Sequence, residues 1–202
     1  MLKRILIPLD GSKLSEEVLP FVTTLAKGMG SLPVLLTVVD AGEFSSAAGV
    51  MHGHLISDLI EHSHKWAEGY LHSVRDRLKE EGTVAATRVT VGSPAEGIIS
   101  QADLAGAGLI AMSTHGRSGL ARWTMGSVAE RVLREAGTPL LLYRATGKGG
   151  AGALGSVLLP LDGSPAAEQA VPLATYFAKT LAIPLTVARV VPTTVFAFAE
   201  DG

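Results

Sequence analysis

Short apolar runs alternate with longer amphipathic segments along the first 145 residues, and this alternation constrains the fold more than any other feature. A run that is apolar throughout is typical of a strand covered on both faces, and such strands belong to parallel sheets with connecting helices. Strands are predicted at residues 2–9, 33–39, 84–91, 109–112 and 138–144. Helices are predicted at residues 12–27, 55–81, 94–105 and 127–135. The sequence therefore predicts an α/β fold: an open, parallel, five-stranded, Rossmann-like sheet with helices on both faces.

Local signals predict how the helices begin and which face they bury. Ser12 is expected to cap the first helix. Residues 93–96 and 127–130 both read as capping boxes, in which a serine accepts from an amide and a glutamate reaches back. The long helix at 55–81 carries a stripe that is expected to be buried, made of Leu55, Leu59, Trp66, Tyr70, Val74 and Leu78.

The opening pattern of the chain recurs near its end. Residues 157–164, Val-Leu-Leu-Pro-Leu-Asp-Gly-Ser, match residues 5–12, Ile-Leu-Ile-Pro-Leu-Asp-Gly-Ser. The match continues through a helix and, one gap later, residues 184–190 match residues 33–39. This repeat stops after a strand, a helix and a strand. We therefore expect a domain at 1–145, a flexible glycine-rich linker at 146–155 and an incomplete second copy at 156–202.

A strand–helix–strand copy buries too little apolar surface to be stable alone. Its apolar faces must be covered by the first domain, by another chain or by further residues of the same protein. Because open sheet edges recruit partners, we expect a homodimer.

Composition narrows the classes of function. Asp and Glu number 19 against 17 Lys and Arg, so the formal net charge is -2 and no basic field is available to hold nucleic acid. The absence of cysteine excludes disulfides, thiolate catalysis and cysteine-based metal sites. No apolar stretch approaches the roughly 18 residues that span a bilayer. A cytoplasmic protein with neither nucleic-acid nor membrane partners is expected.

Two loops are expected to meet at the carboxyl edge of the sheet, where doubly wound folds bind ligands. One is Pro8–Ser12 and the other runs from Ser113 to Ser127. Gly116, Gly126 and Ser127 suit a phosphate cradle, because glycine permits close approach and a helix N-terminus attracts anions. Ser127 is explained equally well as a helix cap, and Asp10 as an Asx turn.

The stretches at 7–12, 159–164 and 112–133 resemble the universal stress protein family, across residues 1–145 and part of 156–191. That resemblance implies a strand order of 3-2-1-4-5 and binding of ATP or AMP, possibly with Mg. Its motif, Gly-x2-Gly-x9-Gly-(Ser/Thr), is matched by Gly116 and Gly126-Ser127. Ser113 replaces the first glycine, and its side chain would either crowd the nucleotide or add a hydroxyl donor.

Carried over position by position, the resemblance implies three groups of binding residues. They are Pro8, Leu9, Asp10 and Val38 for the adenosine, Met112, Ser113 and Gly116 for the sugar and phosphates, and Gly126, Ser127 and Val128 for the phosphates. The implied function is that of an adenine-nucleotide-binding stress-response regulator or sensor. No catalytic residue is predicted, and any ATP hydrolysis is expected to be slow, because no evident general base is positioned at the phosphates.

Other interpretations compete with this one. A nucleotide-free dimeric interaction module of the same fold is favoured by Ser113 and by the unfinished repeat. A hydrolase or transferase of the same fold is favoured only by His115. The histidines between residues 52 and 72 lack the clean spacing of a structural zinc site, so no metal is predicted. Residues 150–155 fit G-x-G-x-x-G but precede a strand, so they are interpreted as linker.

Overall fold

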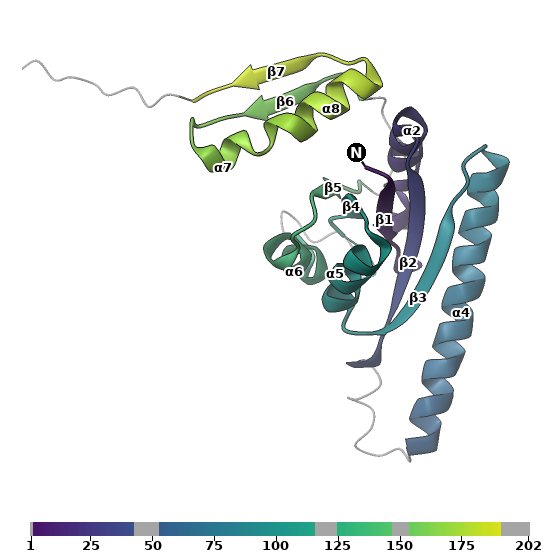
Figure 1. Ribbon diagram of the computed structural model, residues 1–202. Helices are drawn as coiled ribbons and strands as arrows, with labels where there is room; N and C mark the ends of the chain where they lie inside the picture. The colour runs from purple at the N-terminus through teal and green to yellow at the C-terminus, as the bar shows by residue number, and fades with distance from the viewer. Residues whose placement is uncertain (1, 43–52, 116–124, 147–153, 191–202) are drawn as a thin grey trace, which may run out of the picture. The chain divides into compact units, whose positions relative to one another are not determined.

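The computed structural model describes residues 2–42, 53–115, 125–146 and 154–190. The chain divides into two compact units, Met1–Gly152 and Ala153–Gly202, and each is considered by itself (Figure 1). Most of the predicted linker and of the loop at 41–54 lies outside the described residues.

The first unit is built on one parallel five-stranded sheet. Its strands are β1 (Arg4–Pro8), β2 (Leu32–Asp40), β3 (Ala86–Gly92), β4 (Leu109–Ser113) and β5 (Leu140–Tyr143). They are ordered β3-β2-β1-β4-β5, and every pairing is parallel. The predicted fold and strand order are therefore confirmed. β1 lies at the centre, with β2 and β3 on one side and β4 and β5 on the other, so the strand order reverses between β1 and β4.

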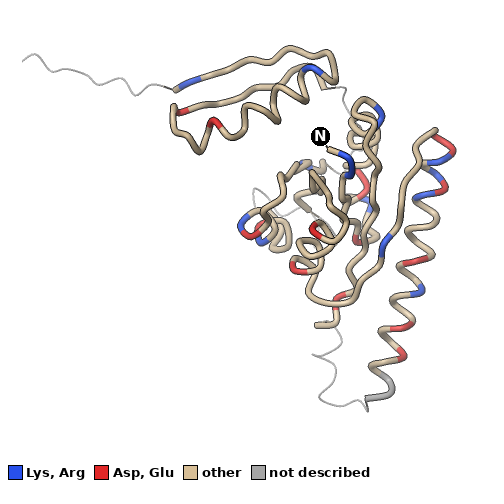
Figure 2. The backbone as a smooth tube through the Cα atoms, viewed as in Figure 1, with Lys and Arg blue, Asp and Glu red and all other residues tan. Residues whose placement is uncertain are grey.

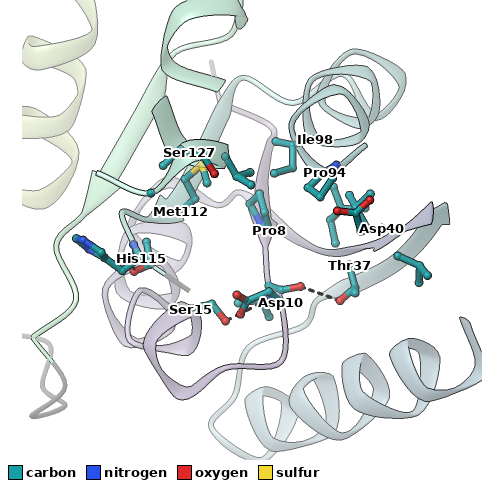
Figure 3. A pocket seen from close by; sticks show the side chains of 18 of the residues that line it. Pro8, Asp10, Ser15, Thr37, Asp40, Pro94, Ile98, Met112, His115 and Ser127 are labelled. Carbon is teal, nitrogen blue, oxygen red and sulfur yellow. Dashed lines mark hydrogen bonds between the residues drawn. The ribbon is translucent and has the colours of Figure 1, made fainter. Parts of the chain in front are cut away.

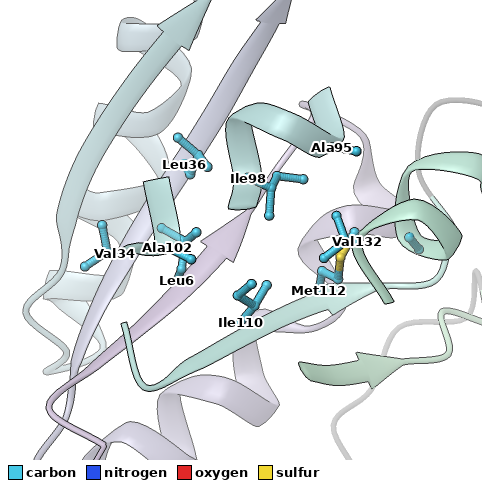
Figure 4. Close-up of a cluster of buried hydrophobic side chains, with 10 residues drawn as sticks. Leu6, Val34, Leu36, Ala95, Ile98, Ala102, Ile110, Met112 and Val132 are labelled. Atoms are coloured by element: carbon cyan, nitrogen blue, oxygen red, sulfur yellow. The ribbon is translucent and has the colours of Figure 1, made fainter. Parts of the chain in front are cut away.

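Helices cover both faces of this sheet. They are α1 (Lys13–Glu16), α2 (Leu19–Met29), α4 (Gly53–Glu80), α5 (Pro94–Ala105) and α6 (Ser127–Glu135). Leu6 and Ile110 point to one face, where they pack with Ile98 of α5 and Val132 of α6 (Figure 4). Side chains alternate along a strand, so Ile5 and Ile7 point to the other face, and both are fully buried. Coverage on both faces explains why the central strands β1 and β4 are almost entirely apolar.

The helix predicted at 12–27 is interrupted. α1 ends at Glu16, and α2 begins at Leu19 with Pro20 in its first turn. Proline has no N–H to donate to the preceding turn, so it starts a helix more readily than it continues one. The cap predicted at Ser12 is confirmed, because its Oγ accepts from the Ser15 amide at 3.1 Å.

The two predicted capping boxes are wrong. Ser93 occupies the N-cap position of α5, but its side chain accepts no cap hydrogen bond, and Glu96 pairs with Arg131 of α6 at 2.6 Å instead of reaching back. At α6 the cap position is Gly126, and Ser127 is the first helical residue. Glu130 there pairs with Arg134 one turn on, at 2.7 Å. Each glutamate therefore pairs with an arginine, Glu96 with one on the neighbouring helix and Glu130 with one in its own helix.

The stripe predicted on α4 is correct only in its C-terminal half. Val74 and Leu78 are buried, together with Ala67 and Leu71, which the prediction omitted. These four pack toward β2 and β3, the strands that α4 contacts. Leu59 and Trp66 are 39% and 50% exposed, so the apolar stripe continues beyond the part of the sheet that α4 covers. Charged residues of both signs cover the rest of α4 (Figure 2).

The second unit contains the predicted strand–helix–strand pattern. It consists of β6 (Val157–Pro160), α7 (Pro165–Glu168), α8 (Val171–Leu181) and β7 (Leu185–Ala188), with the two strands parallel. Leu161 donates to the Ala188 carbonyl as Leu9 donates to that of Leu36, both at 2.8 Å. This register aligns the two copies with a constant offset, so the gap inferred from sequence is not needed.

The second copy leaves apolar side chains exposed. Leu158 is the counterpart of Leu6, which is fully buried beneath α5 and α6 in the first unit. Leu158 is 65% exposed, and Val187 on β7 is 58% exposed. Among the described residues, the second copy has strands and helices equivalent only to β1, α1, α2 and β2.

Candidate functional site

A cavity of about 620 Å³ opens at the carboxyl ends of β1, β2 and β4 (Figure 3). Doubly wound sheets bind ligands in this position, where the strand order reverses. The volume falls within the range of about 300 to 1,000 Å³ typical of small-molecule sites. Helix α4 contributes one wall, and the beginnings of α5 and α6 contribute others.

The turn after β1 forms one side of the cavity. Asp10 accepts from the Ser12 amide at 2.9 Å, and Gly11 between them has φ +84°, which favours glycine. Thr37 of β2 donates to the Leu9 carbonyl at 2.9 Å, which ties the turn to the neighbouring strand. The Asx turn predicted at Asp10 is therefore present. Its carboxylate also lines the cavity, so the structural role does not remove it from the site.

The end of β4 forms the opposite side. Ser113 is buried, and its Oγ accepts from the His115 amide at a long 3.4 Å. Thr114 donates from its amide to the Tyr143 carbonyl at 2.9 Å, and its Oγ1 lies 2.9 Å from Nδ1 of His115. The hydroxyl that replaces a family glycine thus supports its own loop while it lines the cavity.

Helix α6 points its N-terminus at the cavity. The Gly126 amide donates to the Thr114 carbonyl at 3.0 Å, and a Cβ on Gly126 would lie only 3.1 Å from that oxygen. Ser127 and Val128 follow in the first turn, where amides have no carbonyl partner within the helix. These amides and the positive end of the helix dipole favour an anion.

Helix α4 contributes residues that sequence reasoning did not assign to the site. His62, Ser63 and Trp66 line the cavity, and their spacing places them on one helix face. Trp66 was assigned to the apolar stripe of α4, and the local sequence pattern does not distinguish a buried stripe from a cavity wall. Asp40, Pro94 and Ile98 also line the cavity and were likewise missed.

Negatively charged side chains and the positive end of a helix dipole both line the cavity. Asp10 and Asp40 are the carboxylates among the described lining residues, which include two histidines but neither lysine nor arginine. Figure 3 shows Asp40 and Thr37 on one side, Ser127 and Met112 on the other, and Asp10 beside Ser15. The part of the lining that follows β1 and β2, here called the acidic end, therefore carries both carboxylates, whereas a different part presents the N-terminus of α6.

Nine of the ten predicted binding residues line this one cavity: Pro8, Leu9, Asp10, Val38, Met112, Ser113, Gly126, Ser127 and Val128. The tenth, Gly116, lies outside the described residues, as do Arg117 and Arg122. Within the described ranges, no three His, Asp or Glu side chains gather as a metal site requires. No helix in those ranges is long and apolar enough to cross a membrane.

Residues 1–144 match the sequence profile of the universal stress protein family. The chain belongs to the universal stress protein family. A family member from Methanocaldococcus jannaschii, universal stress protein MJ0531, is 34% identical over 142 residues, which cover 70% of this chain and 82% of that protein. Universal stress protein YxiE of Bacillus subtilis is 28% identical and is covered over its full length.

Solved structures of the family share the fold. A universal stress protein from Archaeoglobus fulgidus aligns with 95% of this chain and 68% of its own, with a TM-score of 0.75 and 22% identity. A universal stress protein solved in complex with cAMP aligns with 72% of this chain and 98% of its own, with a TM-score of 0.51 and 20% identity. The alignment with the Archaeoglobus fulgidus protein extends into the second unit of this chain, whereas the alignment with the cAMP-bound protein covers about one domain.

Proposed function

We propose that this protein binds an adenine nucleotide, ATP or AMP, in the cavity and acts as a stress-response regulator or sensor. The observation that supports this most is the polarity of the cavity, with the N-terminus of α6 at one end and acidic residues at the other. A nucleotide has the matching polarity, since its phosphates are anionic and its nucleoside is a neutral hydrogen-bond donor. The family member solved with cAMP supports the same ligand class.

The phosphates are assigned to the N-terminus of α6. Ser127 and Val128 offer backbone amides, and Ser127 adds a hydroxyl, whereas the amide of Gly126 is used by the Thr114 carbonyl and Gly126 contributes close approach. Gly116 joins them by family resemblance. A side chain at position 126 would press on the Thr114 carbonyl, because its Cβ would lie 3.1 Å from that oxygen. If ATP is the ligand, Mg²⁺ would offset the phosphate charge.

The nucleoside is assigned to the acidic end. Pro8, Leu9, Val38 and Met112 supply apolar walls for the base. Asp10 gives one acceptor position to the Ser12 amide, and a carboxylate has about four such positions. We assign another to a ribose hydroxyl or to the base.

Calorimetric titration of the purified protein tests this assignment. ATP with magnesium, AMP and cAMP are titrated into the native chain, Gly126→Val and Gly137→Val. Gly137 is the matched control, because nothing lies within 4 Å of a Cβ built there. We expect micromolar binding at about one site per chain, weakened at least about tenfold by Gly126→Val alone, which corresponds to roughly 1.4 kcal/mol. An absence of binding by every nucleotide at millimolar concentration would refute the proposal.

We further propose that the protein works by binding rather than by turnover, in the cytoplasm. Residues 1–145 form the nucleotide-binding domain in this proposal, and residues 156–202 form an incomplete second repeat joined by the linker at 146–155. Phosphate release from ATP is expected to stay near the uncatalysed background in an assay with saturating enzyme. Rapid release that His115→Ala abolishes would instead assign a hydrolase.

A second candidate function is that of a dimeric interaction module. It is favoured by the exposed apolar side chains of Leu158 and Val187, since exposed apolar surface of this kind often marks an interface. Sedimentation equilibrium of the full chain and of Leu158→Asp separates the possibilities. A dimer that the substitution dissociates supports the module, and a monomer at all concentrations excludes it as a homodimer.

A further inference from the structure

The wall that α4 contributes to the cavity contains one large aromatic side chain. Trp66 is 50% exposed, although tryptophan buries more apolar surface than any other residue when it is packed. The indole of Trp66 stacks on Tyr70, with ring centroids 5.5 Å apart and planes within 4°. Tyr70 in turn donates to Glu16 of α1 at 3.0 Å. The indole is therefore held in place by its neighbour and still leaves half of its surface uncovered.

The indole also lies against the turn that carries Asp10. A Cβ on Gly11 would overlap the ring of Trp66, with Cζ2 only 3.1 Å away. Gly11 thus meets two requirements at once, a positive φ and the absence of a side chain beneath the tryptophan. This contact fixes Trp66 at the acidic end of the cavity, next to Asp10.

The acidic end is the one that disfavours phosphate. Asp10 and Asp40 both carry negative charge there, whereas the N-terminus of α6 lies with Ser127 on the other side (Figure 3). A nucleotide oriented by this field places its base, and not its phosphates, toward the turn after β1. Trp66 stands at that turn, with His62 and Ser63 one helical turn before it.

We propose that Trp66 is a ligand-contacting residue that packs against the planar base and makes the cavity selective for nucleotides over other phosphate esters. This inference rests on the proposed function and adds to it the group that recognises the base. The stacked Tyr70 holds the indole in place, so little conformational entropy is lost when a base packs on it. Aromatic stacking with a base is insensitive to which base is present, so the selectivity is for a base over none.

Two ligands that differ only in the base test the proposal. AMP and ribose 5-phosphate are titrated calorimetrically into the native chain, Trp66→Leu and Trp66→Phe. Trp66→Leu is expected to weaken AMP by about fivefold to a hundredfold, leave ribose 5-phosphate within about twofold, and be largely restored by Trp66→Phe. Equal losses for the two ligands would show that Trp66 only shapes the cavity, and no loss would show that it is not in contact; either result overturns the inference. Failure of the native chain to bind AMP is a different result, which refutes the proposed function itself.

Fluorescence gives a second measurement that does not depend on the stability of a Trp66 variant. The chain has two tryptophans, so Trp123→Phe leaves Trp66 as the sole indole. AMP is expected to quench its emission and shift it to shorter wavelength with the calorimetric affinity, whereas ribose 5-phosphate is not. Saturation with AMP, verified by calorimetry on the same variant, without any change in emission would overturn the assignment.

Discussion

Gly11 and Gly30 both adopt left-handed backbone conformations in the first unit, with φ of +84° and +62°, but their surroundings differ. A Cβ on Gly11 meets the indole of Trp66, whereas a Cβ on Gly30 meets nothing within 4 Å. Alanine substitutions at the two positions therefore distinguish the cost of a left-handed backbone conformation from the cost of steric overlap with a neighbouring side chain. This difference matters because Gly11 adjoins Asp10 in the cavity wall.

Gly11→Ala is expected to destabilise the first unit more than Gly30→Ala. Left-handed backbone costs a non-glycine residue about 1–2 kcal/mol, and overlap with a packed side chain adds about 1–3 kcal/mol. Urea denaturation followed by circular dichroism measures both. Equal losses would mean that Trp66 moves aside without cost, and the contact between Gly11 and the indole would then have no energetic weight.

Tyr70 makes stability depend on alkaline pH. Burial raises its pKa above the ordinary value of 10.0, and the negative charge of Glu16 raises it further. The folded state therefore keeps the phenol proton at a pH where the unfolded state loses it. The resulting stabilisation is complete below pH 10.0 and declines as pH rises above that value.

Tyr70→Phe tests this dependence. The variant is expected to lose about 0.5–1.5 kcal/mol at neutral pH with the hydrogen bond to Glu16. Between about pH 8 and 11, roughly the range around the ordinary tyrosine pKa, its free energy of unfolding should also fall less steeply with pH than that of the native chain. Urea denaturation at each pH measures both effects. Parallel pH profiles for the two proteins would contradict the assignment.

The sequence could place a residue in the cavity lining where its position combines a local turn with the edge of the sheet, whereas the binding role of that residue stays a prediction. Asp10 and Gly126 follow strand ends or precede helices, so their neighbourhood in the chain also places them in the cavity. Trp66 and Asp40 were missed for a different reason. Trp66 is distant in sequence from the turn that it contacts, and nothing in its local pattern distinguishes a cavity wall from a buried stripe.

At the scale of elements, the approach of α5 to β2 depends on Gly97. A Cβ there would lie 2.9 and 3.0 Å from the two methyl groups of Val38, which lines the cavity. Glycine inside a helix normally costs about 0.5–1 kcal/mol relative to alanine. Its presence in α5 is explained by the close packing of the helix on the strand.

Gly97→Ala is therefore expected to destabilise despite its better helix propensity. Overpacking costs about 1–3 kcal/mol, which exceeds the propensity gain. In the background of Val38→Ala, the same substitution should be neutral or stabilising, and a double-mutant cycle by chemical denaturation measures that coupling. An additive cycle would show that α5 and β2 do not press on each other at this point.

Element positions followed from periodicity, whereas element ends often did not. Most of the strands could be predicted because they are short runs that are apolar on both faces. β3 was instead recognised from its β-branched residues, since it also contains Thr87, Arg88 and Thr90. The break between α1 and α2 occurs at Pro20, a local signal that was overlooked. The capping box predicted for α5 failed because Glu96 pairs with Arg131 of another helix. β3 begins at Ala86 rather than at Val84, which is 75% exposed. Tertiary contacts decide such ends, so local propensity does not reveal them.

At the scale of the whole molecule, the two units differ in completeness. The first has five paired strands and helices on both faces, whereas the described part of the second has two strands and exposed Leu158. A small unit with two strands gains little from apolar burial. The first unit should therefore contain nearly all the cooperative stability of the chain.

A chain shortened to residues 1–152 tests this. Its free energy of unfolding, measured by urea denaturation, is expected to stay within about 0.5 kcal/mol of the full chain, because surface changes away from a core have effects of that size. The complementary fragment, residues 153–202, should show little cooperative unfolding. A large loss in the shortened chain would mean that the second unit stabilises the first.

The Asp-Gly-Ser turn occurs twice with the same geometry. Asp162 accepts from the Ser164 amide at 2.8 Å as Asp10 does from that of Ser12, and Gly163 has φ +87°. A hydrogen bond from the Ser164 side chain, together with the one from the Ser164 amide, lowers the pKa of the exposed Asp162 carboxyl below its ordinary value. Yet no counterpart of β4 or α6 accompanies the second turn among the described residues. The duplicate therefore shows that the Asp-Gly-Ser turn folds in the same way with or without a described β4 and α6 beside it, so the turn by itself does not identify a ligand site.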